Sequence, residues 1–247
     1  MSEVGQRLGD ELRLGTFLKL PVVETVELMA LAKLDFVVID LEHSPMSMES
    51  AARLLSVAKA LGMDTLVRIP SHGYEWIQRS LDAGAGGVLV PHVDTRDQAD
   101  SVVSAAAFPP HGTRGFGPTS RAGDWAIEST RSYRDHAERA AVVVQIESET
   151  GVANIDSILE AGVDSVFVGP ADLSVAMGVP DDSDELARAQ TAVLTAARRA
   201  GASCGIAAPE GGAARGRISS GFSYAVVGND ATMLGQSARR MVDDFHA

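Results

Sequence analysis

The chain has few of the residues that mark a secreted or membrane-spanning protein. Cys204 is its one cysteine, so no internal disulfide can form, which agrees with a reducing compartment. No segment is long and apolar enough to cross a bilayer, and we expect no membrane partner. The N-terminus, MSEVGQRLGDELRLG, is charged and lacks the apolar core of a signal peptide. These features predict a cytoplasmic protein.

Positive charge is also scarce. The chain has 21 Lys and Arg against 33 Asp and Glu, a net charge of −12. A nucleic-acid partner is therefore not expected, because such proteins need a positive surface that displaces counterions from phosphates. Among the three lysines, only Lys19 comes at the end of a predicted strand. Schiff-base chemistry, which needs a buried lysine there, is thus restricted to one residue.

A zinc motif is missing as well. The six histidines form no HxH or HxxxH pattern, and no second cysteine accompanies Cys204. His72, His92 and His111 follow strands or lie in loops, so any of them could line the rim, but we expect them on the surface or behind a functional site.

Short apolar runs alternate with segments of helical period along the chain. The predicted strands lie at residues 14–19, 36–41, 65–69, 87–90, 141–146, 165–168, 203–207 and 224–227. The predicted helices lie at 24–33, 49–61, 74–84, 96–106, 151–161, 184–200, 210–220 and 230–245, with a further one near 3–12. Asp94-Thr95 is a typical start for the fourth helix, and Gly62, Gly84, Gly162 and Gly201 are typical helix ends.

This alternation predicts a closed (β/α)₈ barrel that forms a single domain over residues 1–247. A doubly wound open sheet is the alternative, but it would commonly carry a GxGxxG after the first strand, and none is there. The Gly/Pro-rich stretch 107–125 is too long for an ordinary connection. We expect it to wall or cover the functional site.

Polar residues follow several predicted strands. Glu147 and Asp172 come just after two strands separated by one helical segment, which places both carboxylates at one rim of a barrel. Two acidic oxygen donors suit a hard divalent cation such as Mg²⁺ or Mn²⁺. The GPADLS turn adds a substrate site: Gly169 and Pro170 make a tight exit, and the amides of Ala171 and Asp172 begin a short helix that can hold a small carboxylate.

The second and third strands end in charged groups. The guanidinium of Arg68 is suited to neutralising a substrate carboxylate or a developing enolate. His43 is a candidate base, and Asp40 or Glu42 could orient its ring. The alternative is a structural ion network, but so many ionisable groups beside apolar strands favour function, because unpaired burial of charge is costly.

The same residues carry a resemblance to the HpcH/HpaI aldolase family. The matching blocks follow the family order with similar spacing over about residues 14–235, and they are FVVIDLEHSP, VRIP, IQRSLDAGAGGVLVPHV, FPPHGTRGFG, SRAGDW, VVVQIES and VFVGPADLSVAMG. The resemblance implies a (β/α)₈ barrel and a class II aldolase of aromatic or sugar-acid catabolism. Such an enzyme uses Mg²⁺, Mn²⁺ or Co²⁺ to cleave a 4-hydroxy-2-oxo acid to pyruvate and an aldehyde through a metal-held pyruvate enolate. It also implies a hexamer, a trimer of dimers in which a C-terminal helix packs on a neighbour.

Residue roles carry over with the resemblance. It implies Glu147 and Asp172 as metal ligands, Gln145 and Ala171 as substrate contacts, His43 as base, Arg68 as transition-state stabiliser and Asp82 as support for His43. Lys19 departs from the family, where a small residue is common; it either shapes the aldehyde pocket or faces solvent. Three rival functions remain: a Schiff-base aldolase that uses Lys19, an acyl-CoA lyase of the same superfamily, and a non-catalytic oxo-acid-binding barrel. The acidic chain shows no basic tract for a CoA nucleotide.

Overall fold

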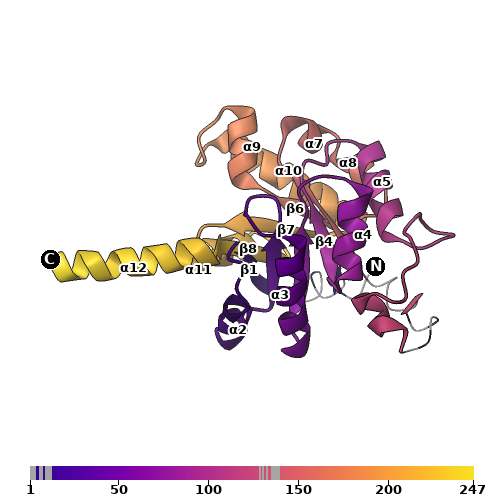
Figure 1. Cartoon of the computed structure of the whole chain (residues 1–247). Coiled ribbons are helices and arrows are strands. Elements are labelled where there is room, and N and C mark those ends of the chain that lie inside the picture. The colour runs from indigo at the N-terminus through magenta and orange to yellow at the C-terminus, as the bar shows by residue number, and fades with distance from the viewer. Residues whose placement is uncertain are drawn as a thin grey trace.

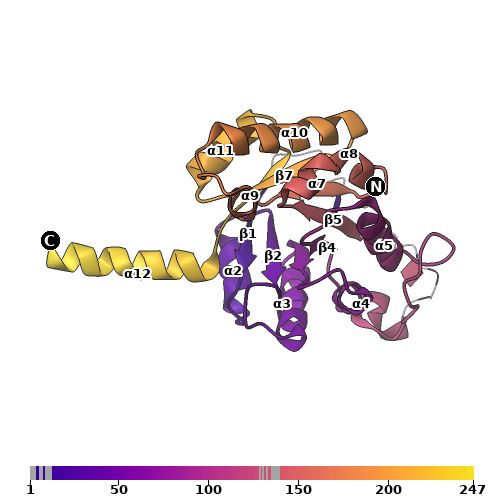
Figure 2. The same cartoon turned by 90° about the horizontal axis from the view of Figure 1, so that it is seen from above.

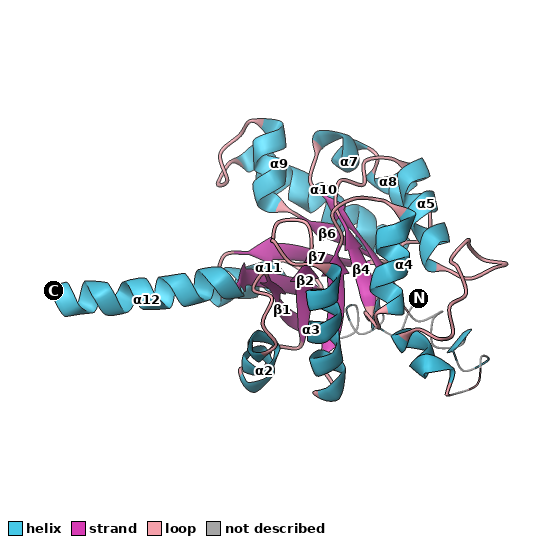
Figure 3. Ribbon diagram, viewed as in Figure 1, coloured by secondary structure: helices cyan, strands magenta, loops and turns pink. Residues whose placement is uncertain are grey.

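Eight parallel strands close into a barrel in the order β1 to β8, with β1 paired to β8 (Figures 1 and 3). We describe a computed structural model of the chain, which covers residues 4–5, 8, 13–127, 129, 131, 133–134 and 140–247. The strands are β1 Arg13–Leu18, β2 Phe36–Asp40, β3 Asp64–Arg68, β4 Gly87–Val90, β5 Ala141–Ile146, β6 Ser165–Val168, β7 Ser203–Ala208 and β8 Tyr224–Asn229. The predicted (β/α)₈ barrel is therefore confirmed, and each strand end lies within two residues of its expected place.

Helices surround the barrel (Figure 2). They are α2 Glu24–Leu31, α3 Met48–Ala60, α4 Tyr74–Asp82, α5 Arg96–Ala106, α7 Glu149–Ala153, α8 Ile155–Leu159, α9 Pro170–Met177, α10 Asp184–Ala200, α11 Gly211–Ser219 and α12 Asp230–His246, with a 3₁₀ segment η1 Arg121–Ala126. The helix predicted over 151–161 is divided at Asn154 into α7 and α8. Thr95 caps α5 in a capping box with Gln98, as its sequence predicts. In the helix predicted near 3–12, Val4, Gly5 and Leu8 are helical, and the others lie outside the described residues.

Side chains of each strand alternate between two apolar cores. Val37, Ile39 and Val67 face outward to the helices, in the larger core. Phe36, Val38, Leu66, Ala141, Val143, Phe167, Tyr224 and Val226 face inward and fill the barrel, and Val4 and Leu8 join this inner core. The barrel is therefore a packed solid whose interior, below the strand-end layer, is largely apolar and contains a buried hydrogen bond between the Ser165 and Tyr224 hydroxyls (3.0 Å).

The stretch 107–125 follows α5 and leads into β5, and it runs along the outer surface of α4. The Gly115 amide donates to the Tyr74 hydroxyl (2.7 Å), Lys59 at the end of α3 pairs with Asp124 (3.2 Å), and η1 packs on α4. The prediction that this stretch walls the site is wrong within a single chain. A segment that follows a helix begins at the opposite end of the barrel from the carboxyl ends of the strands.

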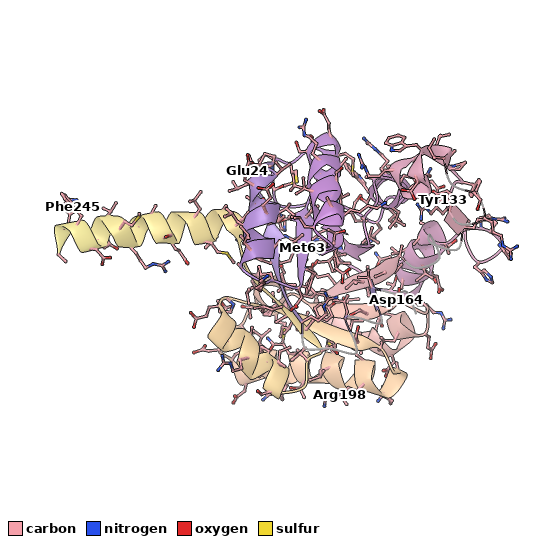
Figure 4. The ribbon with its side chains drawn as sticks, turned by 90° about the horizontal axis from the view of Figure 1, so that it is seen from below. Glu24, Met63, Tyr133, Asp164, Arg198 and Phe245 are labelled. Carbon is pink, nitrogen blue, oxygen red and sulfur yellow. The ribbon has the colours of Figure 1, made fainter. Side chains whose placement is uncertain are left out.

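Helix α12 projects away from the barrel. Figure 1 shows it extending to one side as a long free arm, and Figure 4 shows Phe245 near its tip, far from the barrel. Within α12 only Asp230, its first residue, is buried. Across the described parts of the chain, we find no helix whose length and apolarity would let it span a membrane.

Candidate active site

The candidate site is the uppermost layer of the barrel interior. Asp40, Arg68 and Gln145 lie two residues beyond inward-facing Val38, Leu66 and Val143 on their strands, and Glu147 lies two residues after Gln145, just beyond β5. A period of two therefore points these side chains into the barrel mouth. All four are buried, at 6% exposure or less. The sequence predicts these strand-end residues as a cluster, and the structure brings them together.

Asp40 and Arg68 form a bidentate ion pair at the centre of this layer. Arg68 donates from Nε to Oδ1 (3.0 Å) and from Nη2 to Oδ2 (2.7 Å) of Asp40. The guanidinium carbon lies 4.4 Å from the centroid of the Phe17 ring, so a cation–π contact supports it from below. The pairing of two planar groups fixes the orientation of Arg68 before any substrate arrives.

Asp40 accepts three further hydrogen bonds. Lys19 Nζ donates to its Oδ2 (2.7 Å), and the amides of Glu42 (3.1 Å) and His43 (3.2 Å) donate to its Oδ1. Burial raises the pKa of Asp40, but the hydrogen bonds from Arg68 and Lys19 and the charge of Arg68 outweigh it and lower the pKa to about 2. Asp40 is therefore a fixed anion across the physiological range.

Lys19 is not a solvent-facing residue. Its Nζ donates both to Asp40 and to the backbone carbonyl of His43 (2.9 Å), and its side chain is 24% exposed. An ammonium group held by a carboxylate and a carbonyl is a poor nucleophile, because its lone pair carries a proton. These contacts disfavour a Schiff base at Lys19.

The backbone of His43 is bonded to the buried site, whereas its ring is largely exposed. The His43 amide donates to Asp40, whereas the carboxylate beside the ring is that of Glu42, with Oε2 3.7 Å from Nε2. The side chain is 57% exposed. Glu42, which is nearly buried, also lies 3.3 Å from Arg68 Nη1. Of the two carboxylates expected to orient the His43 ring, Asp40 instead holds the His43 amide, and Glu42 is the one that lies beside the ring.

Glu147 is a buried carboxylate with a very different environment. The His92 amide donates to its Oε1 (2.8 Å), and Gln145 Nε2 donates to its Oε2. Burial raises the pKa of Glu147 to about 7; contacts with His92 lower it, and the charges of Asp172 and Glu42 raise it again. This corner of the site holds more negative charge than its neighbours neutralise.

The missing side chain of Gly169 lets Gln145 and Glu147 pack closely against its backbone. A Cβ at this position would lie 2.9 Å from Gln145 Nε2 and 3.3 Å from Glu147 Oε2. Oε1 of Gln145 is buried without a hydrogen-bond partner. Pro170 occupies the first turn of α9, after the cap residue Gly169 and before the exposed Ala171 and Asp172. This polar corner therefore leaves little space for a side chain at position 169 and contains one buried acceptor, Gln145 Oε1, without a partner.

The donors in this corner suit a hard cation. Within the described residues, no three His, Cys, Asp or Glu side chains gather into a ready-made cage. Mg²⁺ commonly takes one or two protein carboxylates and fills its shell with water and substrate oxygens. Glu147, destabilised by nearby Asp172 and by its own burial, supplies the unpaired negative charge that such a site requires. The residues therefore fit a divalent cation held by two carboxylates.

His92 belongs to this site, which its sequence position alone did not establish. Its ring Nδ1 lies 2.8 Å from Glu147 Oε1 and its Nε2 3.6 Å from Glu42 Oε1. Its backbone is left-handed, with φ of 54°, a conformation that turns both its amide and its ring toward Glu147. The signal in the sequence is its place after β4, at the same rim as the other strand-end groups.

Other predicted residues lie elsewhere. Asp82, at the C-terminal end of α4, pairs with Arg114 (2.8 Å) and accepts from the Tyr133 hydroxyl (3.3 Å). Support of His43 by Asp82 is therefore not met by contacts within a single chain. His72 Nε2 lies 2.7 Å from the Pro91 carbonyl, behind the site, and His111 lies in the stretch 107–125.

Comparison with known proteins identifies relatives over the whole barrel. The HpcH/HpaI aldolase/citrate lyase family matches residues 13–235. A hydroxypyruvate/pyruvate aldolase of Rhizorhabdus wittichii is 35% identical over 95% of this chain and 94% of its own. A 5-keto-4-deoxy-D-glucarate aldolase of Salmonella paratyphi C is 32% identical over 95% and 93%. The crystal structure of a family protein from Burkholderia cenocepacia J2315 superposes with a TM-score of 0.92, at 31% identity and full coverage of both chains.

The predicted carbon–carbon lyase class is confirmed at the level of the family, since these relatives are named as aldolases. Fold, strand-end chemistry and the extent of the match agree. The chain belongs to the HpcH/HpaI aldolase/citrate lyase family.

Proposed function

We propose that the protein is a metal-dependent class II aldolase that cleaves a 4-hydroxy-2-oxo acid reversibly to pyruvate and an aldehyde. One observation carries the proposal: buried Glu147, which lies near the charge of exposed Asp172 and is short of positive charge, shares the barrel mouth with the preorganised Arg68–Asp40 pair. The first is suited to a divalent cation and the second to an anionic reaction intermediate.

Glu147 and Asp172 would hold the cation, which we propose to be Mg²⁺, Mn²⁺ or Co²⁺. When bound, such an ion supplies Lewis-acid polarisation of the oxo-acid oxygens. Gln145 holds Glu147 in place through its amide, and Gly169, which has no side chain, lets both groups lie against its backbone. The amides of Ala171 and Asp172 begin α9 and favour the carboxylate of pyruvate there.

Arg68 and His43 perform the remaining tasks. Arg68 is fixed by Asp40 and by the Phe17 ring, so it offers positive charge to the enolate oxygen without having to reorganise. The exposed ring of His43 is free to take a proton from the 4-hydroxyl during cleavage and to return one to the aldehyde oxygen in the reverse direction. The Glu42 carboxylate lies 3.7 Å from the ring.

The test is deuterium exchange into the pyruvate methyl group, followed by NMR with and without Mg²⁺, Mn²⁺ or Co²⁺. We expect metal-dependent exchange in the wild type, loss with chelator, and loss in Glu147→Ala, because the cation site is then incomplete. The matched control is Glu149→Ala, which removes an exposed carboxylate two residues away. Metal-independent exchange, or none in the wild type, would contradict the proposal.

The rival functions give different results in the same assays. A Schiff-base enzyme exchanges the methyl protons in chelator and is trapped by borohydride with pyruvate. A non-catalytic binding barrel binds metal and pyruvate without exchange. An acyl-CoA lyase consumes acyl-CoA substrates and leaves hydroxy-oxo acids intact. Because the named relatives are a hydroxypyruvate/pyruvate aldolase and a 5-keto-4-deoxy-D-glucarate aldolase, the aldehyde panel begins with short hydroxylated and acidic aldehydes, including tartronate and succinic semialdehydes.

We further propose that α12 is covered in a homo-oligomer, a hexamer built as a trimer of dimers. Its exposed apolar residues include Leu234, Met241, Val242 and Phe245, and Phe245 is 84% exposed. An apolar helix that projects from a barrel is typical of a subunit contact. Light scattering after gel filtration tests this: Leu234→Ser with Val242→Ser lowers the mass of the particle, whereas Arg239→Ser on the same helix leaves it unchanged.

A further inference from the structure

Lys19 extends the inward-facing series of β1 into the site. Phe17 packs against the inner core, and Lys19 lies two residues beyond it. Its ammonium group donates to Asp40 Oδ2 and to the carbonyl of His43. Two strand ends, β1 and β2, are thus joined by one side chain.

The backbone of His43 is consequently held at both its N–H and its C=O group. The amide donates to Asp40 Oδ1 (3.2 Å), and the carbonyl accepts from Lys19 Nζ (2.9 Å). Asp40 is itself fixed by Arg68. The backbone that carries the proposed base is therefore tied to the same carboxylate that orients the guanidinium, while the His43 ring stays exposed and free to turn.

The backbone at Lys19 is itself held by hydrogen bonds to Asp230. Its amide donates to Asp230 Oδ1 (2.8 Å), and the Leu20 amide donates to Asp230 Oδ2 (3.1 Å). Asp230 is 4% exposed and begins α12. A lysine side chain loses much rotamer freedom when it is held in one position, so it positions a partner well only where its backbone is fixed, as it is here.

We propose that Lys19 is a positioning residue, which clamps the His43 peptide against Asp40 so that the base and Arg68 keep a fixed separation during proton transfer. The inference rests on the proposed aldolase function. Errors of about 1 Å in such placement cost on the order of 10²-fold in rate. Lys19 touches no reacting atom in this role.

The alternative role for Lys19, contact with the aldehyde half of the substrate, predicts a different defect. Exchange of the pyruvate methyl protons needs no aldehyde, so a lysine that serves only the aldehyde leaves it unchanged. The structure favours the clamp because two of the three Nζ protons are already donated to groups of the site.

The experiment measures methyl exchange in Lys19→Met, which keeps the length of the side chain and removes its charge and donors. We expect the exchange rate at saturating pyruvate to fall about 10- to 100-fold, with KM for pyruvate changed by less than about threefold, because orientation rather than binding is lost. Lys19→Arg keeps the charge and donors and restores exchange to within about fivefold. Lys59→Met, on the end of α3, is the control for loss of a lysine.

Each other result overturns the proposal. Unchanged exchange in Lys19→Met, with a raised KM for aldehyde in cleavage or synthesis, assigns Lys19 to the aldehyde half. An equal loss in Lys19→Met and Lys19→Arg, accompanied by lower thermal stability in both, assigns it a purely structural role. Borohydride trapping of pyruvate on Lys19 makes it a nucleophile. Absence of metal-dependent exchange in the wild type removes the aldolase proposal itself, and the clamp with it.

Discussion

Two buried carboxylates on one rim have opposite electrostatic surroundings. Asp40, at the end of β2, has two cations within hydrogen-bond distance, and its pKa is lowered to about 2. Glu147, just beyond β5, has backbone, amide and imidazole neighbours, and burial raises its pKa to about 7. The β2 side is complete in the protein alone, whereas the β5 side lacks a positive charge.

The difference separates two kinds of functional group. On the β2 side, Arg68 and Lys19 are already bound to Asp40, so these groups need to reorganise little during the reaction. The unneutralised side stores an unfavourable interaction that a bound cation relieves. Natural proteins keep such destabilising residues where function requires them. Variants of each side distinguish these roles by the sign of their effect.

The largest effect is expected from Arg68→Met, which removes the cation at the centre of the complete side. Asp40 then keeps Lys19 as its remaining cation, together with the amides of Glu42 and His43, and Glu42 loses its neighbouring guanidinium. Breaking a buried ion pair costs about 3–5 kcal/mol of unfolding free energy. Loss of a fixed donor to a developing oxyanion lowers the exchange rate by about 10²- to 10³-fold. Urea unfolding and methyl exchange measure the two, and wild-type-like exchange would exclude Arg68 from the reaction.

A matched pair of neutral substitutions compares the two carboxylates directly in metal-free protein. Asp40→Asn leaves Arg68 and Lys19 without their anion, and we expect a loss of about 3 kcal/mol. Glu147→Gln keeps an acceptor for the His92 amide and removes a buried charge, so above pH 7 we expect a gain of about 1–3 kcal/mol. Denaturant unfolding at equal pH checks both. Destabilisation by both substitutions would show that Glu147 is satisfied without a cation.

The contribution of Asp40 to the unfolding free energy depends on pH. Its folded pKa, about 2, lies below its ordinary value of 3.8, so its ionised form stabilises the fold. That stability is present above pH 3.8 and is lost as the pH falls through 3.8 toward 2. The loss amounts to about 2 kcal/mol, and it is missing in Asp40→Asn. Unfolding free energies of both proteins between pH 5 and pH 2 test this; parallel curves would contradict it.

The sequence predicts which residues line the barrel mouth better than it predicts which partners they contact. A period of two along FVVID, TLVR and VVVQIE suffices to place Asp40, Arg68, Gln145 and Glu147 inside the mouth, because β geometry is local. The partner of Lys19 depends on how β1 meets β2, which no local pattern contains. The role of His92 depends on a left-handed backbone at a non-glycine residue.

The position of the stretch 107–125 follows from the order of strands and helices. The helix over 96–106 is predicted correctly, and a segment after a helix starts at the amino-terminal end of a barrel. The expectation that this stretch walls the site gave more weight to its length and composition than to its place in the alternation. Topology was the stronger constraint.

The smallest expected effect comes from Gly169→Ala, which adds one methyl group to the unneutralised side. The new Cβ would meet Gln145 Nε2 at 2.9 Å and Glu147 Oε2 at 3.3 Å, and both are side-chain ends that can shift by tenths of an ångström. The methyl group therefore displaces the carboxylate without removing it. Because groups that orient metal ligands typically contribute 10- to 100-fold to affinity, we expect Mn²⁺ to bind about 10-fold more weakly, as titration calorimetry would measure. The complete side is untouched, so the acid stability attributed to Asp40 stays at its wild-type value. A variant that binds Mn²⁺ normally but loses that acid stability would mean that the two sides are coupled, and the comparison between them would fail.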